Sequence, residues 1–146
     1  MNTCTGSVGQ KIESALELDK ILEMATEIRS MFINMLKDSM NTDTTQGSCA
    51  FACFFAKTVF DRFTDYQTAY RGGDGHGDGG YIDADGIHHG HYWLNIQTAT
   101  QAYIVDITAD QFGADPVVVL PLSKAEQYVS GCQEIVEDHF SDLLEE

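Results

Sequence analysis

Apolar residues between about Gln10 and Lys37 recur at steps of three and four positions, which is the spacing of one face of an α-helix. Most charged residues of this segment fall off the apolar stripe. The pattern predicts one long helix, which could break near Ser30, after a frayed polar terminus over residues 1–9. The stripe consists of Leu18, Ile21, Leu22, Ala25, Ile28, Phe32, Met35 and Leu36.

A second helical segment extends from Cys49 to about Phe63. It follows residues 38–48, whose polar composition predicts a loop. Apolar side chains occupy nearly the whole circumference of this segment, so we expect the helix to be buried in the centre of the fold. These side chains are Phe51, Phe54, Phe55, Val59, Phe60 and Phe63.

The middle of the chain changes to the patterns of loops and strands. Residues 71–80 are dense in glycine and predict a flexible loop. Residues 89–97 and 101–108 alternate or are rich in β-branched side chains, which predicts an antiparallel hairpin whose turn is centred on Thr98 and Ala99. Shorter strands are expected at residues 81–82, before a turn over 83–86, and at residues 116–120.

Two helices are expected near the C-terminal end. Ser123 and Glu126 have the spacing of a capping box, which predicts a helix from Ser123 to about Gly131. A final helix is expected from Gln133 to Leu144. The chain of 146 residues has no internal repeat. Helices, then a small antiparallel sheet, then helices predict a single α+β domain over residues 1–146, which is long enough to bury one core.

Composition narrows the classes of partner. The formal net charge of −15 would repel nucleic acid and anionic lipid, so neither is an expected partner. It fits a basic substrate or partner, or simply a well-solvated surface. The sequence has no apolar run of about 18 residues and no secretory pattern after Met1. The four cysteines do not form paired CxxC units, so a structural zinc site is not expected. The lack of a secretory pattern leads us to expect reduced thiols and a cytoplasmic location.

The most informative stretch is Gly47-Ser48-Cys49, where a cysteine opens a helix after a turn. The positive end of the helix dipole favours a thiolate over a thiol at such a position. In the predicted hairpin, His91 pairs near Asp106, which places both side chains on one face about 5 Å apart at Cβ. A carboxylate within an apolar strand is costly to bury unless it is paired. A register error of one residue would separate the pair.

Other assignments remain open at this stage. Cys53 could replace Cys49 as the nucleophile, and His88 or His89 could replace His91 as the base. His76, His88 and His89 could instead bind a transition metal. Residues 74–85 have the spacing of an EF-hand calcium loop, although a histidine occupies the third position and an aspartate the twelfth.

Three motifs carry a resemblance to a known family. Gly47-Ser48-Cys49, His91-Tyr92-Trp93 and Asp106-Ile107-Thr108 occur in the order of the G-x-C, H-x-W and D-x-T motifs of the transglutaminase-like branch of the papain-like cysteine protease superfamily. The resemblance covers about residues 45–112. The family fold that it implies packs N-terminal helices on a small antiparallel sheet.

The resemblance implies a thiol-dependent hydrolase or acyl-transferase that acts on a peptide or another amide. Cys49 would be the nucleophile, His91 the general base and Asp106 the group that orients the base, with no cofactor. Gln46 would contribute to the oxyanion site. The competing hypothesis is a non-catalytic module that uses the segment rich in glycine, histidine and aspartate to bind a metal ion or a protein partner.

Overall fold

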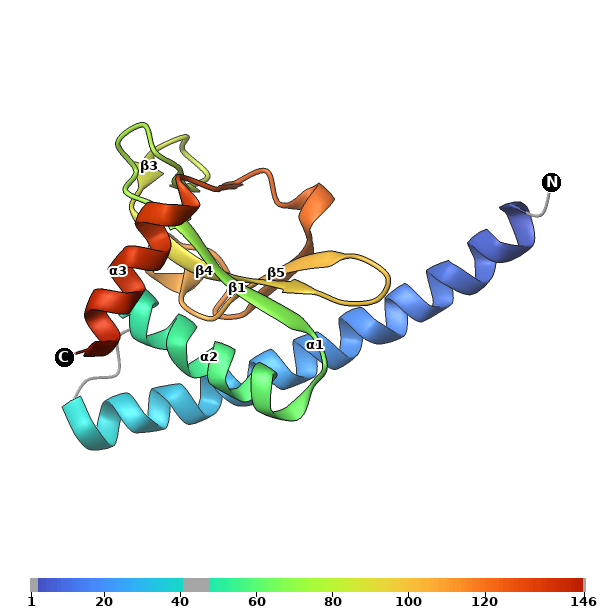
Figure 1. Ribbon diagram of the computed structural model, residues 1–146, viewed down its shortest axis with the longest axis horizontal. Helices are drawn as coiled ribbons and strands as arrows, with labels where there is room; N and C mark the ends of the chain where they lie inside the picture. Colours follow the sequence, from blue (N-terminus) through green and yellow to red (C-terminus); the bar gives the residue numbers. More distant parts are fainter. Residues whose placement is uncertain (1–2, 41–47, 146) are drawn as a thin grey trace.

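The computed structural model describes residues 3–40 and 48–145, which form three α-helices and two antiparallel sheets. The fold is therefore α+β, as expected. Figure 1 shows the order of the elements. The helices are α1 (Thr3–Met40), α2 (Cys49–Phe63) and α3 (Gln133–Glu145), with short 3-10 helices η1 (Ala109–Phe112) and η2 (Leu122–Lys124). The strands are β1 (Gln67–Gly73), β2 (Gly80–Ile82), β3 (His88–His89), β4 (His91–Gln97), β5 (Ala102–Asp106), β6 (Val118–Pro121) and β7 (Tyr128–Val129).

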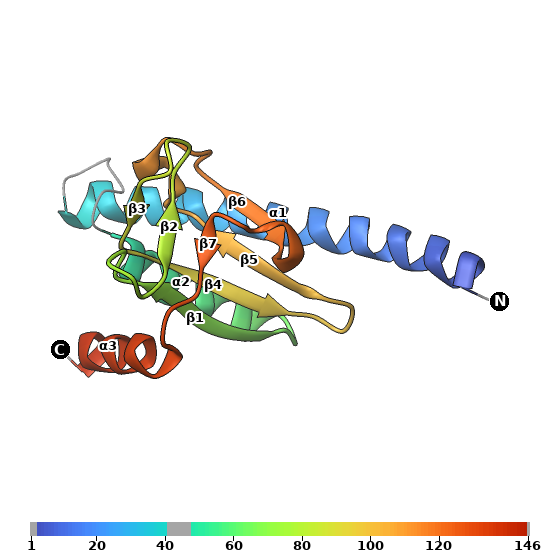
Figure 2. The ribbon, with the colours of Figure 1, turned by 90° about the horizontal axis from the view of Figure 1, so that it is seen from above.

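The larger sheet has the strand order β1-β4-β5-β6 and the smaller one the order β3-β2-β7. All described pairings are antiparallel. The helices pack on one face of the larger sheet (Figure 2), and Tyr81 of β2, Ala125 just after η2 and Tyr128 of β7 pack on the other. The larger sheet is thus the middle layer, and its two faces have separate cores.

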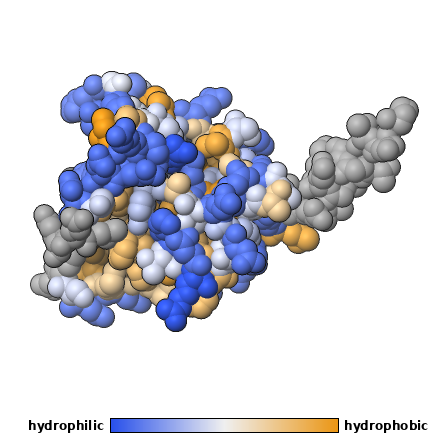
Figure 3. Space-filling view, in the orientation of Figure 1, coloured by the Kyte–Doolittle hydropathy of each residue, from blue (hydrophilic) through white to orange (hydrophobic). Residues whose placement is uncertain are grey.

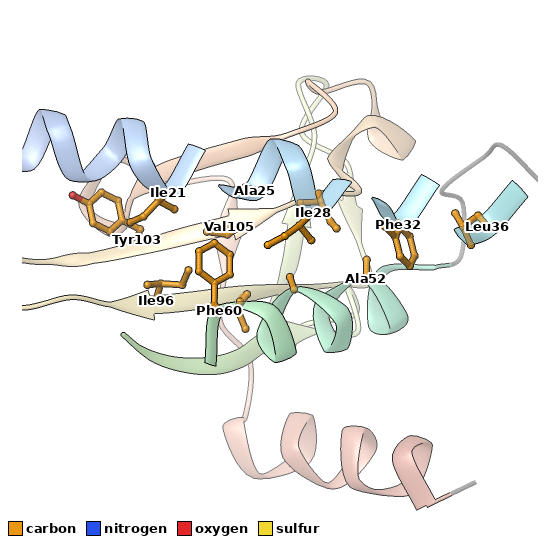
Figure 4. Close-up of a cluster of buried hydrophobic side chains, with 13 residues drawn as sticks. Ile21, Ala25, Ile28, Phe32, Leu36, Ala52, Phe60, Ile96, Tyr103 and Val105 are labelled. Atoms are coloured by element: carbon orange, nitrogen blue, oxygen red, sulfur yellow. The ribbon is translucent and has the colours of Figure 1, made fainter. Parts of the chain in front are cut away.

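The main core lies between the larger sheet and the helices α1 and α2 (Figure 4). Side chains of α1 that are three or four positions apart pack against every second residue of β4 and β5. These are the intervals at which a helix and a strand turn side chains to the same face. Phe60 of α2 is fully buried among them. The core members include Ile21, Ala25, Ile28, Phe32, Leu36, Ala52, Ala56, Leu94, Ile96, Tyr103 and Val105.

The helices differ from their predicted form in two respects. Helix α1 begins at Thr3, so the expected frayed segment over residues 1–9 is wrong from Thr3 onward, and α1 continues through Ser30 without a break. Once a helix has nucleated, each further residue adds one hydrogen bond, so a polar segment can extend it. Helix α2 has the predicted bounds but is not buried all round, since Phe51 and Phe63 are 52% and 70% exposed. Orange surface accordingly gathers in the lower part of Figure 3, where Figure 1 shows α1 and α2.

The strand β1 was not predicted from the sequence. It lies at the edge of the larger sheet and is only partly buried along most of its length, so its hydrophobic alternation is weak. Because β1 extends to Gly73 and β2 begins at Gly80, the segment expected to be a loop over residues 71–80 is reduced to residues 74–79. Gly79 has φ +77, and a Cβ there would lie 2.5 Å from the carbonyl oxygen of Val129. Close backbone packing therefore requires this glycine.

The helix predicted from Ser123 to Gly131 is wrong. The capping-box sequence forms the short helix η2, after which the chain turns and enters β7. Tyr128 and Ala125 are buried against Trp93 and Ile104 of the larger sheet, and this packing determines the local structure in place of the capping preference. The final helix α3 is confirmed.

The predicted hairpin is confirmed, but its register differs. Leu94 pairs with Val105 and Gln97 pairs with Ala102, so continuing the register by one position places Trp93, not His91, opposite Asp106. Thr98 closes the turn by donating its backbone N–H to the carbonyl of Gln101. The difference from the predicted pairing is two positions, and the side chains therefore remain on the predicted faces.

Candidate active site

Three elements meet at one end of the larger sheet. Helix α2 begins there at Cys49, β4 begins at His91, and β5 ends at Asp106 (Figure 2). Antiparallel pairing of β4 with β5 makes the start of one strand the neighbour of the end of the other. Cys49, His91 and Asp106, which the sequence predicted to act together, are therefore brought to one place by the ends of three elements.

His91 and Asp106 form a fully buried pair. The imidazole Nε2 lies 2.7 Å from Oδ2 of Asp106, and the two residues are 1% and 2% exposed. They are diagonal rather than directly opposite, and diagonal neighbours on one face of a sheet are within reach of long side chains. The predicted His91–Asp106 contact thus forms.

The Asp106 carboxylate is satisfied by further donors. Its Oδ2 also accepts a hydrogen bond from the Tyr128 hydroxyl at 2.9 Å. Its Oδ1 accepts bonds from the backbone N–H and the hydroxyl of Thr108, at 2.9 and 3.3 Å. Hydrogen bonds of this kind stabilise the ionised carboxylate and fix its orientation. Asp106 can therefore hold the imidazole of His91 in one orientation.

Aromatic rings enclose the imidazole of His91. The rings of Tyr81 and Phe112 meet it edge-on, with centroid distances of 6.0 and 4.9 Å, and Trp93 lies 6.2 Å away. Burial alone lowers the pKa of His91, but the charge of Asp106 and the hydrogen bond to it outweigh this effect, and Cys49 adds to them, so the pKa rises to about 9. A proton on this imidazole is stable at neutral pH.

Cys49 interacts with the same imidazole. Its thiol contributes to the raised pKa of His91 both as a hydrogen-bond partner and as a negative charge. The geometry is nevertheless loose, since Nδ1 of His91 is buried without a well-aligned hydrogen-bond partner among the described residues. Hydrogen bonds between catalytic groups are often poorly aligned before substrate binds. The arrangement places a thiol, an imidazole and a carboxylate in sequence.

The alternative nucleophile and bases are placed less suitably. Cys53 is buried, and this burial, with smaller contributions from Cys49 and Asp106, raises the pKa of its thiol well above the usual value. His89 pairs with Asp83 at 2.8 Å on the smaller sheet, and His88 is exposed there. Neither arrangement resembles the buried contact of His91.

Metal binding finds little support in the part of the chain that the structure describes. No group of three or more histidine, cysteine, aspartate or glutamate side chains lies close enough there to hold a metal ion. His76, His88 and His89 therefore do not converge with further ligands, and residues 74–85 do not bring together a set of carboxylates for calcium. Asp74 instead accepts a hydrogen bond from the backbone N–H of His76 at 2.7 Å. The predicted oxyanion residue, Gln46, lies outside the described residues.

Sequence reasoning missed two tyrosines near the site. Tyr128 was assigned to a helix, so nothing indicated its bond to Asp106. Tyr92 follows His91 in β4, and burial, with a smaller effect of the nearby Cys49 charge, raises the pKa of its phenol. Its hydroxyl is hydrogen-bonded with Nδ1 of His139 on α3. A tyrosine between the histidine and the tryptophan of a strand carries no signal of this contact in the sequence alone.

A comparison of the chain with protein-family models, curated proteins and solved structures found no match. None of the helices in the described ranges is long and apolar enough to cross a lipid bilayer.

Proposed function

We propose that the protein is a thiol-dependent acyl hydrolase or acyl-transferase that acts on an amide. Cys49 is the nucleophile, His91 the base and Asp106 the group that orients it. The observation that carries the proposal is the fully buried His91–Asp106 pair, whose imidazole also neighbours a thiol at the start of a helix. A buried ion pair has a high desolvation cost, so a functional role is the simplest reason for its presence here.

The chemistry proceeds in two acyl-transfer steps. His91 takes the thiol proton of Cys49, and the sulfur attacks the amide carbonyl carbon to form a tetrahedral intermediate. The imidazolium then returns its proton to the leaving amine, the C–N bond breaks, and a thioester remains. Water or an amine attacks this thioester, loses a proton to His91, and releases the acyl group with the Cys49 thiol restored. Asp106 stays ionised and stabilises the imidazolium in both steps.

The same proposal extends to the fold, which we assign to the papain-like superfamily and its transglutaminase-like branch. Trp93 and Thr108, the last residues of the H-x-W and D-x-T motifs, support this assignment because each has a role beside the site. Trp93 packs against Tyr128, and Thr108 donates two hydrogen bonds to Asp106. The acidic surface favours a basic amide-bearing substrate, and the free thiols of the described cysteines suit a cytoplasmic location.

Alkylation of individual cysteines by iodoacetamide tests the proposal. A free thiol is only a few per cent ionised at pH 7, so we expect Cys49 to react roughly tenfold faster, or more, than an ordinary thiol. Cys132 is exposed and provides an internal reference, while buried Cys53 should react slowly. Mass spectrometry of tryptic peptides, with fragmentation to separate Cys49 from Cys53, measures each rate. Equal rates at Cys49 and Cys132 would refute an activated thiol.

Two further measurements distinguish catalysis from reactivity alone. In His91→Gln, whose folding is checked by the fluorescence of Trp93, the rate advantage of Cys49 should disappear. An activated acyl ester such as p-nitrophenyl acetate should acylate Cys49 faster than Cys132 and release its product over several turnovers. Acylation without turnover, together with no ammonia release from glutamine-containing peptides, would count against an acyl-transfer enzyme.

A further inference from the structure

A hollow of about 360 Å³ lies on the larger sheet, away from the face that packs on the helices, and η2 borders it. Residues of β1 and β4 form most of its lining, and Ala102 of β5 and Leu122 of η2 complete it. The volume lies at the lower end of the range of small-molecule sites in proteins. Its lining includes Gln67, Arg71, Asn95, Gln97, Ala102 and Leu122.

Arg71 is the only charged residue of this lining. Although the chain as a whole has a net charge of −15, an anionic group in this hollow would meet a positive side chain and no negative side chain of the lining.

The Arg71 guanidinium is held in place from one side. Its Nη1 donates a hydrogen bond to Oε1 of Gln133 at 3.1 Å, and the amide nitrogen of Gln133 is itself bonded to the carbonyl of Tyr70 at 2.7 Å. Nε and Nη2 form the other edge of the guanidinium. The Nε atom of that edge is buried without a hydrogen-bond partner among the described residues. That edge matches the two oxygens of a carboxylate.

A second unsatisfied atom belongs to a neighbouring residue of the lining. Oδ1 of Asn95 is also buried without a partner in the described part of the chain, and it is an acceptor that needs an N–H donor. Ala69 pairs with Asn95 and Arg71 pairs with Trp93, so Arg71 and Asn95 are diagonal neighbours on one face of the sheet. Buried polar groups in native proteins are nearly always paired, so one donor and one acceptor left open beside each other indicate a ligand that supplies both partners.

We propose that the hollow binds the carboxylate and adjacent N–H of an acylated amino acid, either as a free molecule or as the last residue of a peptide. The carboxylate accepts hydrogen bonds from the Nε edge of Arg71, and the N–H, one carbon away, donates to Oδ1 of Asn95. Ala102 and Leu122 contact an apolar side chain of the ligand. This site does not depend on Cys49 or on the proposed acyl transfer.

N-acetyl-leucine is the first probe, and ¹H–¹⁵N NMR titration of the full chain is the measurement. We expect saturable shifts of the amides of Ala69, Asn95 and Gln97. Two analogues dissect the contacts without altering the protein. N-acetyl-leucinamide lacks the carboxylate, and the ester that replaces the N–H by oxygen lacks the donor. Each should bind at least roughly tenfold more weakly, since each leaves a buried polar group unpaired.

Variants then test the two residues. Arg71→Gln should weaken binding of N-acetyl-leucine at least roughly tenfold. Asn95→Asp, which offers Arg71 a carboxylate from the protein itself, should weaken it similarly. Cys49→Ala should bind as the unaltered protein does. Peptides of two to four residues that end in leucine distinguish the sources: tighter binding than N-acetyl-leucine indicates a peptide C-terminus, and exclusion indicates a free ligand. Absence of saturable shifts, or equal binding of N-acetyl-leucine and its amide, would overturn the proposal.

Discussion

The replacement Asp106→Asn tests the role of the buried carboxylate directly. Asparagine has the shape of aspartate, but its NH₂ group replaces one carboxylate oxygen and cannot accept the hydrogen bonds made to that oxygen. The variant therefore loses either the bonds from His91 and Tyr128 to Oδ2 or the bond from the Thr108 N–H to Oδ1. Without the negative charge, burial dominates and lowers the pKa of His91. We therefore expect the variant to lose both the protonated state of His91 and the stability that this state contributes.

The raised pKa of His91 gives the magnitude. The increase from 6.5 to about 9 corresponds to about 3 kcal/mol in favour of the protonated imidazole in the folded protein. Removing one partner of a buried ion pair costs a similar amount, about 3–5 kcal/mol. Because the folded pKa lies above the unfolded one, the contribution is fully present below pH 6.5 and is lost as the pH rises towards 9. The difference in unfolding free energy between the two proteins should therefore shrink by about 3 kcal/mol across this range.

Urea unfolding at pH 6, 7, 8 and 9 measures this difference. Trp93 is the only tryptophan of the chain and is fully buried near His91, so its fluorescence reports loss of the site and of the fold together. Asp83→Asn is the matched control, because it alters the partly exposed pair of Asp83 with His89 and should leave a much smaller pH dependence. A difference between unaltered protein and Asp106→Asn that stays constant from pH 6 to 9 would refute the reasoning.

Three further substitutions test neighbouring contacts. Tyr128→Phe removes one hydrogen bond to the buried carboxylate, so we expect a loss of about 1.5–3 kcal/mol in urea unfolding and a higher pKa of His91 by NMR titration. Phe60→Ala should cost about 3–5 kcal/mol because the ring is fully buried, whereas Phe63→Ala, at a position 70% exposed, should change the unfolding free energy by less than about 0.5 kcal/mol. Arg29→Met removes the ion pair that ties α1 to η1, and we expect a lower melting temperature by circular dichroism, with a loss of about 1–2 kcal/mol. Equal effects of the two phenylalanine changes, or none from the other two, would contradict the assigned contacts.

The sequence predicted most reliably those elements whose patterns are set by a single interface. The bounds of α2 and α3 were readable because apolar positions recur at helical spacing between clear polar breaks. By contrast, β1 is an edge strand with one weakly buried face, and its tyrosine, arginine and glycines do not alternate. The segment that forms η2 and β7 has good helical capping residues, but contacts of Tyr128 with distant strands decide its structure. Contacts of that kind are not visible along the chain.

The candidate site was predicted in outline for a physical reason. The two strands of the hairpin must turn Leu94, Ile96, Tyr103 and Val105 towards the helices, since these residues form the main core. That requirement fixes which face His91 and Asp106 share, even when the turn between the strands is placed one residue too early. It does not fix which residue lies opposite which, because that depends on the turn over residues 98–101.

The diagonal placement of the pair has a consequence for the site. Because continuation of the register sets Trp93 opposite Asp106, the indole occupies the position beside the carboxylate that a directly opposed histidine would have taken. The imidazole then lies at the very start of β4, where the strand ends its pairing and α2 begins. A histidine at position 93 would instead pack against Tyr128, as Trp93 does. In this register His91 and Asp106 are diagonal neighbours. His91 is therefore next to Cys49, while Asp106 stays buried within the sheet.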